Sequence, residues 1–275
     1  MTKKSFIQKL VAAPYLVWAL IFIIVPLVMV AYFAFTDENG TFTMHYVKDV
    51  FQYGDIFLRS VSLAAIATVI CLVIAYPVAY ILSQMKRRSQ STMLMIVMLP
   101  MWINFLLRTY AWMTLLGNEG VINHIFSIFG LGPFKMLNTQ GAVVLGMVYN
   151  YIPFMILPLY SVMEKIDKNI IEAASDLGCN RTSVLTRVIL PLSVPGIMSG
   201  ITMVFVPAIS TFIISRMLGG GGNLLIGDLI EMQFLGTAYN PNLGAAISLV
   251  LMIIVLVIMT VMNQFDSSDD ERVLL

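Results

Sequence analysis

Long stretches without a charged side chain dominate this sequence. A helix needs about 20 mainly apolar residues to cross the hydrocarbon core of a membrane. Six charge-free runs have about that length: Leu10–Thr36, Ser60–Met85, Ser89–Leu107, Met136–Met163, Val188–Ser215 and Met232–Phe265. They are too long and too continuous for the strands of a membrane barrel. Only 11% of the residues are charged. The sequence therefore predicts an all-α membrane protein with six transmembrane helices.

Two of these runs have unusual boundaries. Three lysines precede the first run, as in a signal peptide: Lys3, Lys4 and Lys9. The apolar stretch that follows is too long for a signal peptide and has no small-residue cleavage site, so we expect an uncleaved first span. We expect the third run to continue past Arg108, through Tyr110 and Trp112.

The basic residues of the loops predict the orientation. They concentrate at the N-terminus, in Lys86–Arg88 and in the connection between the fourth and fifth runs. Lys and Arg mark cytoplasmic loops, so both termini should be cytoplasmic in a multi-pass protein of the bacterial inner or plasma membrane. The expected domains are a cytoplasmic N-terminus (1–9), a six-span permease domain (10–265, with a cytoplasmic loop at 164–191) and an acidic cytoplasmic tail (266–275).

The loops on the opposite side are acidic. Their carboxylates are Asp37, Glu38, Asp49, Asp55, Glu119, Asp228 and Glu231. They form either an ordinary solvated surface or a face that attracts a cationic solute or a delivery protein. The net charge of the chain is only +1, which gives no reason to expect a nucleic-acid partner.

Prolines interrupt several of the runs. They include Pro26, Pro77, Pro100, Pro153, Pro158 and Pro207. Each removes a backbone hydrogen bond and bends its helix. Simple packing kinks and transporter hinges both fit this pattern.

The most polar segment within the apolar body is Glu164–Pro195. Asp167 is a helix-capping residue, Gly178 is a helix terminator, and Asn180 or Thr182 can begin a second helix. This segment should form a helix-turn-helix on the cytoplasmic face. Its first helix carries two carboxylates four residues apart, Glu172 and Asp176, which repel each other. Arg181, Arg187 or a partner protein can relieve that repulsion.

The spacing within this segment matches a known motif. The EAA motif reads Glu-Ala-Ala, three residues, Gly, nine residues, Ile, one residue and Leu-Pro. Here Glu172-Ala173-Ala174, Gly178 and Leu190-Pro191 stand at those positions, and Val188 replaces the isoleucine. The chain therefore resembles the membrane permeases of ABC importers, and the motif lies in the expected loop before the penultimate span.

The resemblance extends to permeases of the PotB type, from spermidine/putrescine importers. It rests on Pro100–Asn104, Arg108–Tyr110, Ile152–Met155, Gly219-Gly220 and Asn223–Gly227. It implies that the cytoplasmic segment is a coupling helix that docks on an ATP-binding subunit. Glu172 would make polar contact with that subunit, Ala173 and Ala174 would allow close approach, and Gly178 would make the turn. The residues expected to couple are Glu172, Ala173, Ala174, Asp176 and Gly178.

The same resemblance implies the partners. They are a second, homologous permease of the PotC type, two ATP-binding subunits of the PotA type, an extracellular solute-binding protein of the PotD type, and membrane lipid. The ATP-binding subunits would hold ATP and Mg²⁺. The chain itself has no GxxxxGK[ST] sequence, so we expect a non-catalytic subunit without a cofactor. The glycine run Gly219–Gly222 is interpreted as a flexible turn.

No catalytic or metal-binding pattern is present. HExxH, GxSxG and paired CxxC are all missing, and His45 and His124 stand alone in loops. We expect no metal site and no enzyme activity. Cys71 and Cys179 do not predict a disulfide.

A polyamine path would need aromatic faces, amides and outer carboxylates. The candidates are Trp102, Asn104, Tyr110, Trp112, Tyr149, Tyr151, Asp228 and Glu231. Each aromatic residue also fits the interfacial belt of membrane proteins. Arg108 and Arg216 would repel a cation if they faced the path. The alternatives are an ABC importer permease for another small solute and an ion-coupled secondary transporter, although no intramembrane carboxylate or inverted repeat is evident.

Overall fold

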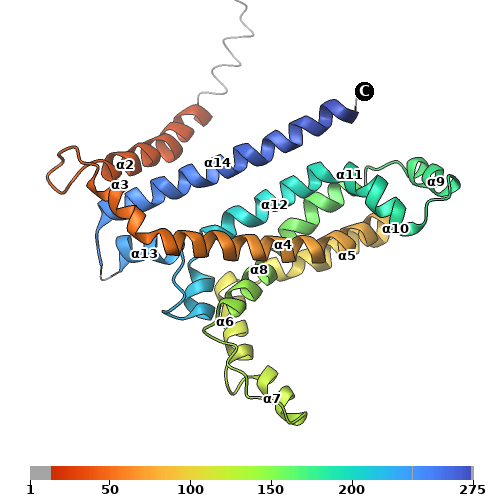
Figure 1. Cartoon of the computed structure of the whole chain (residues 1–275), viewed down its shortest axis with the longest axis horizontal. Coiled ribbons are helices and arrows are strands. Elements are labelled where there is room, and N and C mark those ends of the chain that lie inside the picture. Colours follow the sequence, from red (N-terminus) through yellow and green to blue (C-terminus); the bar gives the residue numbers. More distant parts are fainter. Residues whose placement is uncertain (1–13, 237, 274–275) are drawn as a thin grey trace, which may run out of the picture. The chain divides into compact units, whose positions relative to one another are not determined.

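The computed structural model describes residues 14–236 and 238–273, and their side chains except at 168, 181 and 263–273. The expected N-terminal segment 1–9 lies outside these residues. Helices make up nearly all of the regular structure in the described part, which contains no β-strand beyond one isolated bridge between Thr36 and Phe42. The prediction of an all-α protein is confirmed (Figure 1).

Within the described residues, four helical segments are long and apolar enough to cross a membrane. They are Pro14–Ala34, His45–Gln84, Gln140–Met163 and Pro241–Met262. Two bent helix pairs raise the number to six if each pair forms one span: Arg87–Trp102 with Phe105–Ile128, and Thr182–Leu192 with Val194–Ile209.

The third charge-free run, which was expected to continue past Arg108, is divided into two helices. α5 (Arg87–Trp102) ends before Ile103, and α6 (Phe105–Leu116) begins after Asn104 with a bend of 84° between the two segments. The side-chain oxygen of Asn104 accepts the backbone N–H groups of Leu106 and Leu107 at 2.9 and 3.4 Å. Asn104 therefore caps a new helix, and the run changes direction shortly after Pro100, one of the prolines expected to bend it.

The chain divides into two compact units. The first contains the described residues up to Asp55 together with Leu229–Ile254. It holds α2 (Val25–Ala34), α3 (His45–Asp49), η2 (Val50–Tyr53), most of α13 (Ile226–Leu235) and the first half of α14 (Pro241–Val273). The side-chain amide of Asn242 donates to the carbonyls of Phe33 and Thr36 at 3.1 and 2.7 Å. This amide ties the start of α14 to the end of α2.

A turn in the first unit engages one of the acidic outer-loop residues. The Asp37 carboxylate accepts the backbone N–H groups of Asn39 and Thr41 and the hydroxyl of Thr41. These hydrogen bonds, chiefly those from Thr41, hold the pKa of Asp37 below its ordinary value. Asp37 is therefore at least partly a turn-forming residue.

The second unit contains Ile56–Asp228 and the described residues from Val255 onward. Its densest packing joins α8 (Gln140–Met163) to α12 (Val194–Ile209), which contact each other more than any other helices in the described part. A β-carbon on Gly196 would lie 3.0 Å from the Pro158 carbonyl oxygen, and one on Gly200 would lie 2.6 Å from the Met155 sulfur. Glycine thus allows these helices to approach closely, as in other membrane bundles.

α4 (Gly54–Gln84) also belongs mainly to the second unit. Its buried face is a stripe of mostly small residues that includes Ala64, Ala67, Ala75 and Ala79. Its large apolar side chains lie mainly on the exposed face. The Ser60 hydroxyl on α4 accepts the N–H of Ile226 at 2.9 Å, which connects α4 to the start of α13.

Candidate coupling elbow and solute path

The predicted helix-turn-helix is present, and local sequence explains its first half. α9 (Lys168–Asp176) begins where the Asp167 carboxylate accepts the N–H of Asn169 at 3.0 Å. It ends at Gly178, whose φ of +84° lies in the left-handed region that favours glycine. The N–H of Cys179 then bonds to the carbonyl of Ala174 at 3.1 Å. These contacts, all between residues close together in the sequence, form a tight turn.

The second half starts at Asn180. The Asn180 side-chain oxygen accepts the N–H of Ser183 at 2.8 Å, so Asn180 and not Thr182 caps the second helix. Three short helical pieces follow without a gap: α10 (Arg181–Val184), the π-helical turn η3 (Leu185–Ile189) and α11 (Leu190–Leu192). We call Asp167–Leu192 the elbow.

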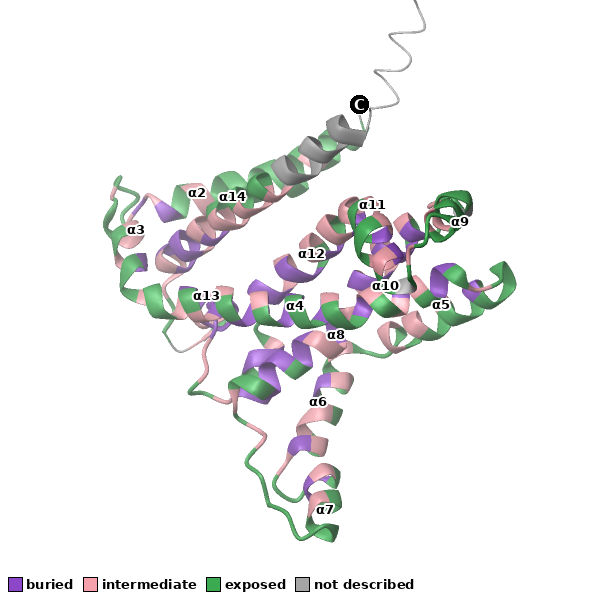
Figure 2. Ribbon diagram, turned by 45° about the vertical axis from the view of Figure 1, so that its right-hand side comes forward, coloured by how far each residue is buried: buried purple, intermediate pink, exposed green. Residues whose placement is uncertain are grey.

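The elbow presents an exposed surface (Figure 2). Glu172, Ala173 and Asp176 are exposed, and Ala174 is half-buried. Leu177, at the tip, is 86% exposed. Neither carboxylate forms an ion pair with a side chain that the structure describes; the side chain of Arg181 is outside that set. Both carboxylates are thus exposed at the surface of the elbow.

A cavity of about 610 Å³ lies behind the elbow. Tyr80 and Gln84 of α4 form one wall, and elbow residues from Ile171 to Leu185, including Cys179, form the other. Next to it, the hydroxyl oxygens of Tyr76 and Ser193 lie 3.1 Å apart. Sequence reasoning missed this pair. The only sequence signal is a serine between Pro191 and Pro195 inside an apolar run.

The structure brings together two of the eight path candidates. The rings of Trp112 and Tyr149 meet edge to face with their centroids 5.3 Å apart. Tyr151 is buried two residues further along α8, and its hydroxyl donates to the carbonyl of Pro207 at 3.3 Å. Tyr149 and Tyr151 leave different sides of the helix because they are two residues apart.

The remaining path candidates lie in different settings. Trp102 and Tyr110 are 75% and 57% exposed. The Asn104 oxygen serves as the α6 cap. Asp228 is buried, and its Oδ2 accepts the N–H of Leu225 at 2.9 Å. Glu231 belongs to the first unit.

Arg108 lies inside α6 against protein. Its Nε and Nη1 are buried and have no hydrogen-bond partner among the described residues. Its guanidinium carbon lies 5.9 Å from the centroid of the Phe105 ring, within cation–π range. Two of the Arg108 nitrogens are therefore withdrawn from any open polar cavity.

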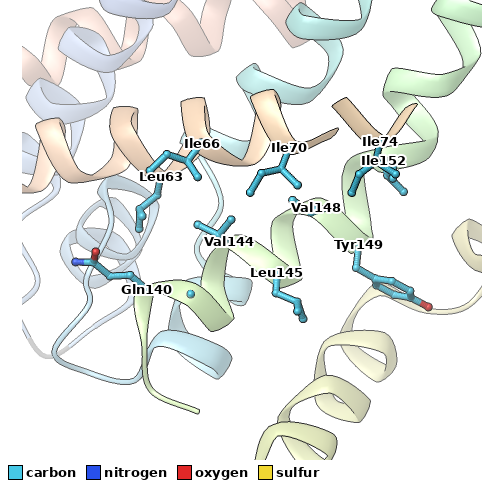
Figure 3. A pocket seen from close by; sticks show the side chains of 11 residues that line it. Leu63, Ile66, Ile70, Ile74, Gln140, Val144, Leu145, Val148, Tyr149 and Ile152 are labelled. Atoms are coloured by element: carbon cyan, nitrogen blue, oxygen red, sulfur yellow. The ribbon is translucent and has the colours of Figure 1, made fainter. Parts of the chain in front are cut away.

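A groove in the second unit is apolar (Figure 3). It has a volume of about 730 Å³ between α4 and α8, and its lining includes Leu63, Ile66 and Ile70 on α4 and Val144 on α8. Only Gln140 and Tyr149 place polar side-chain atoms at its edge, and no lining residue carries a charge. This groove has nothing with which to neutralise a polyamine.

The glycine run is more constrained than the flexible turn expected from sequence. A β-carbon on Gly219 would lie 2.7 Å from a Val143 methyl group, and one on Gly220 would lie 2.7 Å from the Asn138 side-chain oxygen. Only Gly221 and Gly222 have open space. Half of the run is therefore a packed junction, because α8 and the residues before it fill the neighbouring volume.

The described residues contain no group of three or more His, Cys, Asp or Glu side chains that could hold a metal ion. Cys71 is buried, Cys179 is partly exposed, and both are free thiols.

Comparison with known proteins supports the class expected from the sequence, the membrane permeases of ABC importers. Over 252 residues, the chain is 37% identical to the spermidine/putrescine transport system permease protein PotB of Haemophilus influenzae, with 88% of each chain covered. A bacterial ABC transporter involved in the import of the acidic polysaccharide alginate shares the fold, with a TM-score of 0.83, 18% identity, and 97% of this chain and 96% of that chain covered.

A second alginate ABC transporter structure, in complex with an alginate pentasaccharide-bound periplasmic protein, has a TM-score of 0.81 at 19% identity. It covers 95% of this chain and 94% of its own. Residues 74–268 match the family described as the inner membrane component of binding-protein-dependent transport systems. The match includes the elbow and the α8–α12 pair, and the chain belongs to this family of multi-pass inner-membrane transport proteins.

Proposed function

We propose that this chain is a permease subunit of an ATP-driven importer of spermidine and putrescine. The observation that carries the proposal is the 37% identity to a PotB protein over 88% of the chain. The substrate class comes from that relative. The alginate transporters share only the fold, and their cargo is a polyanion of opposite charge.

In this proposal, all six charge-free runs cross the membrane and both termini are cytoplasmic. The bent pair Arg87–Trp102 and Phe105–Ile128 counts as one crossing, and so does the fifth run, Val188–Ser215, which begins at the end of the elbow; this gives the upper number of spans. The basic loops then lie inside and the acidic loops outside. The permease domain covers 10–265, with the elbow in its cytoplasmic loop.

The elbow is the proposed contact with an ATP-binding subunit. Its exposed Glu172 and Asp176 supply negative charge, Ala173 keeps the backbone accessible, and Gly178 makes the turn. The ATP-binding subunits hold ATP and Mg²⁺, and their closure moves the elbow. A second permease encloses the path, and a solute-binding protein delivers the polyamine from outside. Motion of the elbow would open the two permeases toward the outside, so that the path faces each side of the membrane in turn (alternating access).

The proposed path combines aromatic rings and an amide with two carboxylates, of which Asp228 is buried. The Trp112–Tyr149 pair and exposed Trp102 and Tyr110 offer ring faces to ammonium groups. Asp228 and Glu231 supply outer carboxylates. Another small solute on the same frame is the nearest alternative, since fold does not fix cargo.

Uptake measurements test this function. Cells that lack this chain and any redundant polyamine system should lose uptake of radiolabelled spermidine and putrescine, and the wild-type chain should restore it. In vesicles, uptake should require ATP and persist when an ionophore collapses the ion gradients. Unchanged polyamine uptake in the deleted cells would remove the substrate, and gradient-dependent uptake would favour a secondary transporter.

A variant pair tests the role of the elbow. Glu172→Lys should reduce uptake by roughly tenfold, because it reverses a charge at the proposed contact. Glu164→Lys makes the same change in an exposed residue before the elbow and should have a much smaller effect. Equal uptake in the two variants, at equal membrane abundance, would contradict the role of Glu172.

A further inference from the structure

The fifth charge-free run bends sharply at Ser193. The segments Thr182–Leu192 and Val194–Ile209 meet at 69°. Pro195 has no N–H with which to bond the carbonyl four residues earlier. The N–H of Ser193 still bonds to the carbonyls of Ile189 and Leu190, at 2.9 and 3.2 Å, so the helix before the bend is hydrogen-bonded up to Ser193. The bend therefore lies where the local sequence favours it, after α11 and two residues before Pro195.

The Ser193 side chain connects this bend to α4. It is fully buried, and its hydroxyl donates to the Leu190 carbonyl at 3.0 Å. The Ser193 and Tyr76 hydroxyl oxygens lie 3.1 Å apart, and either hydroxyl can be the donor in this contact. The two residues are 117 positions apart in the chain. This polar contact thus joins the residue after the elbow to the last third of α4.

The residues after the bend are closely packed, whereas the residues before it lie beside a cavity. Beyond it, Gly196 meets Pro158 and Val162 of α8, with 3.0–3.1 Å from a β-carbon to the nearest atoms. Before it, the 610 Å³ cavity separates the elbow from Tyr80 and Gln84. Close-packed interiors move as units, so α12 is held by α8 while the elbow has free volume beside it.

We propose that Ser193 is a pivot between the elbow and the α8–α12 pair, and that the Tyr76 hydroxyl passes elbow motion to α4. Tyr76 and Ser193 are positioning residues in this scheme, since they touch neither solute nor nucleotide. The inference rests on the proposed docking of an ATP-binding subunit on the elbow. The inference adds the contact through which a movement of that subunit would reach α4, which is distant from the elbow in the sequence.

Loss of the Tyr76–Ser193 contact should uncouple transport from ATP hydrolysis. The docking face on α9 and the ATP-binding subunits are untouched, so hydrolysis continues. The elbow then moves without moving α4 in step, so fewer solute molecules cross for each ATP consumed.

The complete importer, reconstituted in proteoliposomes with its solute-binding protein, tests the pivot. Tyr76→Phe and Ser193→Ala should each lower spermidine uptake per ATP hydrolysed by about threefold to tenfold, the range for one lost hydrogen bond. The double variant should be no worse than the more affected single variant, because both changes remove the same contact. Tyr80→Phe, the same change one turn along α4, should leave the ratio unchanged.

Three outcomes would overturn the proposal. Uptake and hydrolysis falling in parallel would indicate a structural defect, which melting temperatures of the complexes would also reveal. Multiplying effects in the double variant would mean that the two hydroxyls act separately. An equal loss in Tyr80→Phe would remove the specific role of Tyr76. If the wild-type complex shows no ATP-driven polyamine uptake, the function itself fails and not the pivot.

The cavity behind the elbow offers a second test. Cys179 lines it and is partly exposed, whereas Cys71 is buried. A small methanethiosulfonate reagent should add to Cys179, fill part of the cavity and inhibit wild-type uptake several-fold. The Cys179→Ser complex should be insensitive to the reagent. Normal uptake after complete modification of Cys179, measured by mass spectrometry, would show that the elbow does not need this volume.

Discussion

The elbow and the α8–α12 pair are neighbours in sequence with opposite physical character. α8 is largely buried and meets α12 through glycines with no space for a side chain, whereas α9 exposes most of its length (Figure 2). The elbow is built from short helices held by local caps, and the α8–α12 pair is held by packing. This contrast fits the proposed coupling, in which a partner protein binds the exposed elbow and the closely packed α8–α12 pair moves as one unit.

The largest expected effect lies in the packed pair. Gly196→Leu should prevent correct folding, because its side chain would overlap the Pro158 carbonyl and Val162. Overpacking of this kind costs about 1–3 kcal/mol or more. Gly222→Leu is the matched control, since nothing lies within 4 Å of its β-carbon position. Size-exclusion profiles and melting temperatures in detergent should separate them, and equal stability would contradict close α8–α12 packing.

The next effect tests the turn of the elbow. Gly178→Val places a β-branched residue at a φ of +84°, although nothing lies near its β-carbon position. The backbone strain, on the order of 1–2 kcal/mol, should distort the elbow and reduce uptake by about tenfold while the chain still inserts and folds.

Gly178→Asn is the control for that substitution, because asparagine tolerates the left-handed region. It should retain most of the uptake. If valine and asparagine behave alike, the conformation of the turn does not matter for transport.

A smaller effect tests the exposed tip. Leu177→Ser should leave the stability of the isolated chain within about 0.5 kcal/mol of wild type, since surface changes usually cost little. In the complex, it should weaken retention of the ATP-binding subunit by a few-fold, because Leu177 is 86% exposed and available for an apolar contact. Co-purification ratios measure this, and unchanged retention would place Leu177 outside the interface.

The smallest effect concerns the one departure from the EAA pattern. Val188→Ile adds one methylene at a half-buried position in η3. We expect uptake within about twofold of wild type, given the small cost of such a change. A large loss would show that η3 is packed as tightly as the helices it precedes.

The sequence predicted what local chemistry determines. Asp167 and Gly178 mark the ends of α9 by capping and by backbone conformation, and both act within a few residues of themselves. The apolar runs likewise predicted where helices lie. The prolines predicted some of the bends but not all of the helix geometry. Pro77 lies inside the continuous α4, whereas the 84° bend follows Pro100, at Ile103–Asn104.

The remainder depends on contacts between distant segments. No local pattern pairs Tyr76 with Ser193, or packs Gly219 against Val143. Composition also does not tell whether an aromatic residue meets another ring, as Trp112 does, or is exposed, as Trp102 is. The solute path stays a prediction, because it depends on how helices face one another and not on local sequence.

Crosslinking of the elbow in the assembled importer tests its role most directly. Ser175, exposed on α9, is replaced by cysteine in a Cys71→Ser, Cys179→Ser background, with single cysteines on the surface of the ATP-binding subunit. We predict a disulfide between the two chains whose yield changes when ATP binds. Failure of every pair to crosslink, together with labelling of the introduced α9 cysteine by a membrane-impermeant reagent from outside intact cells, would contradict a cytoplasmic coupling elbow.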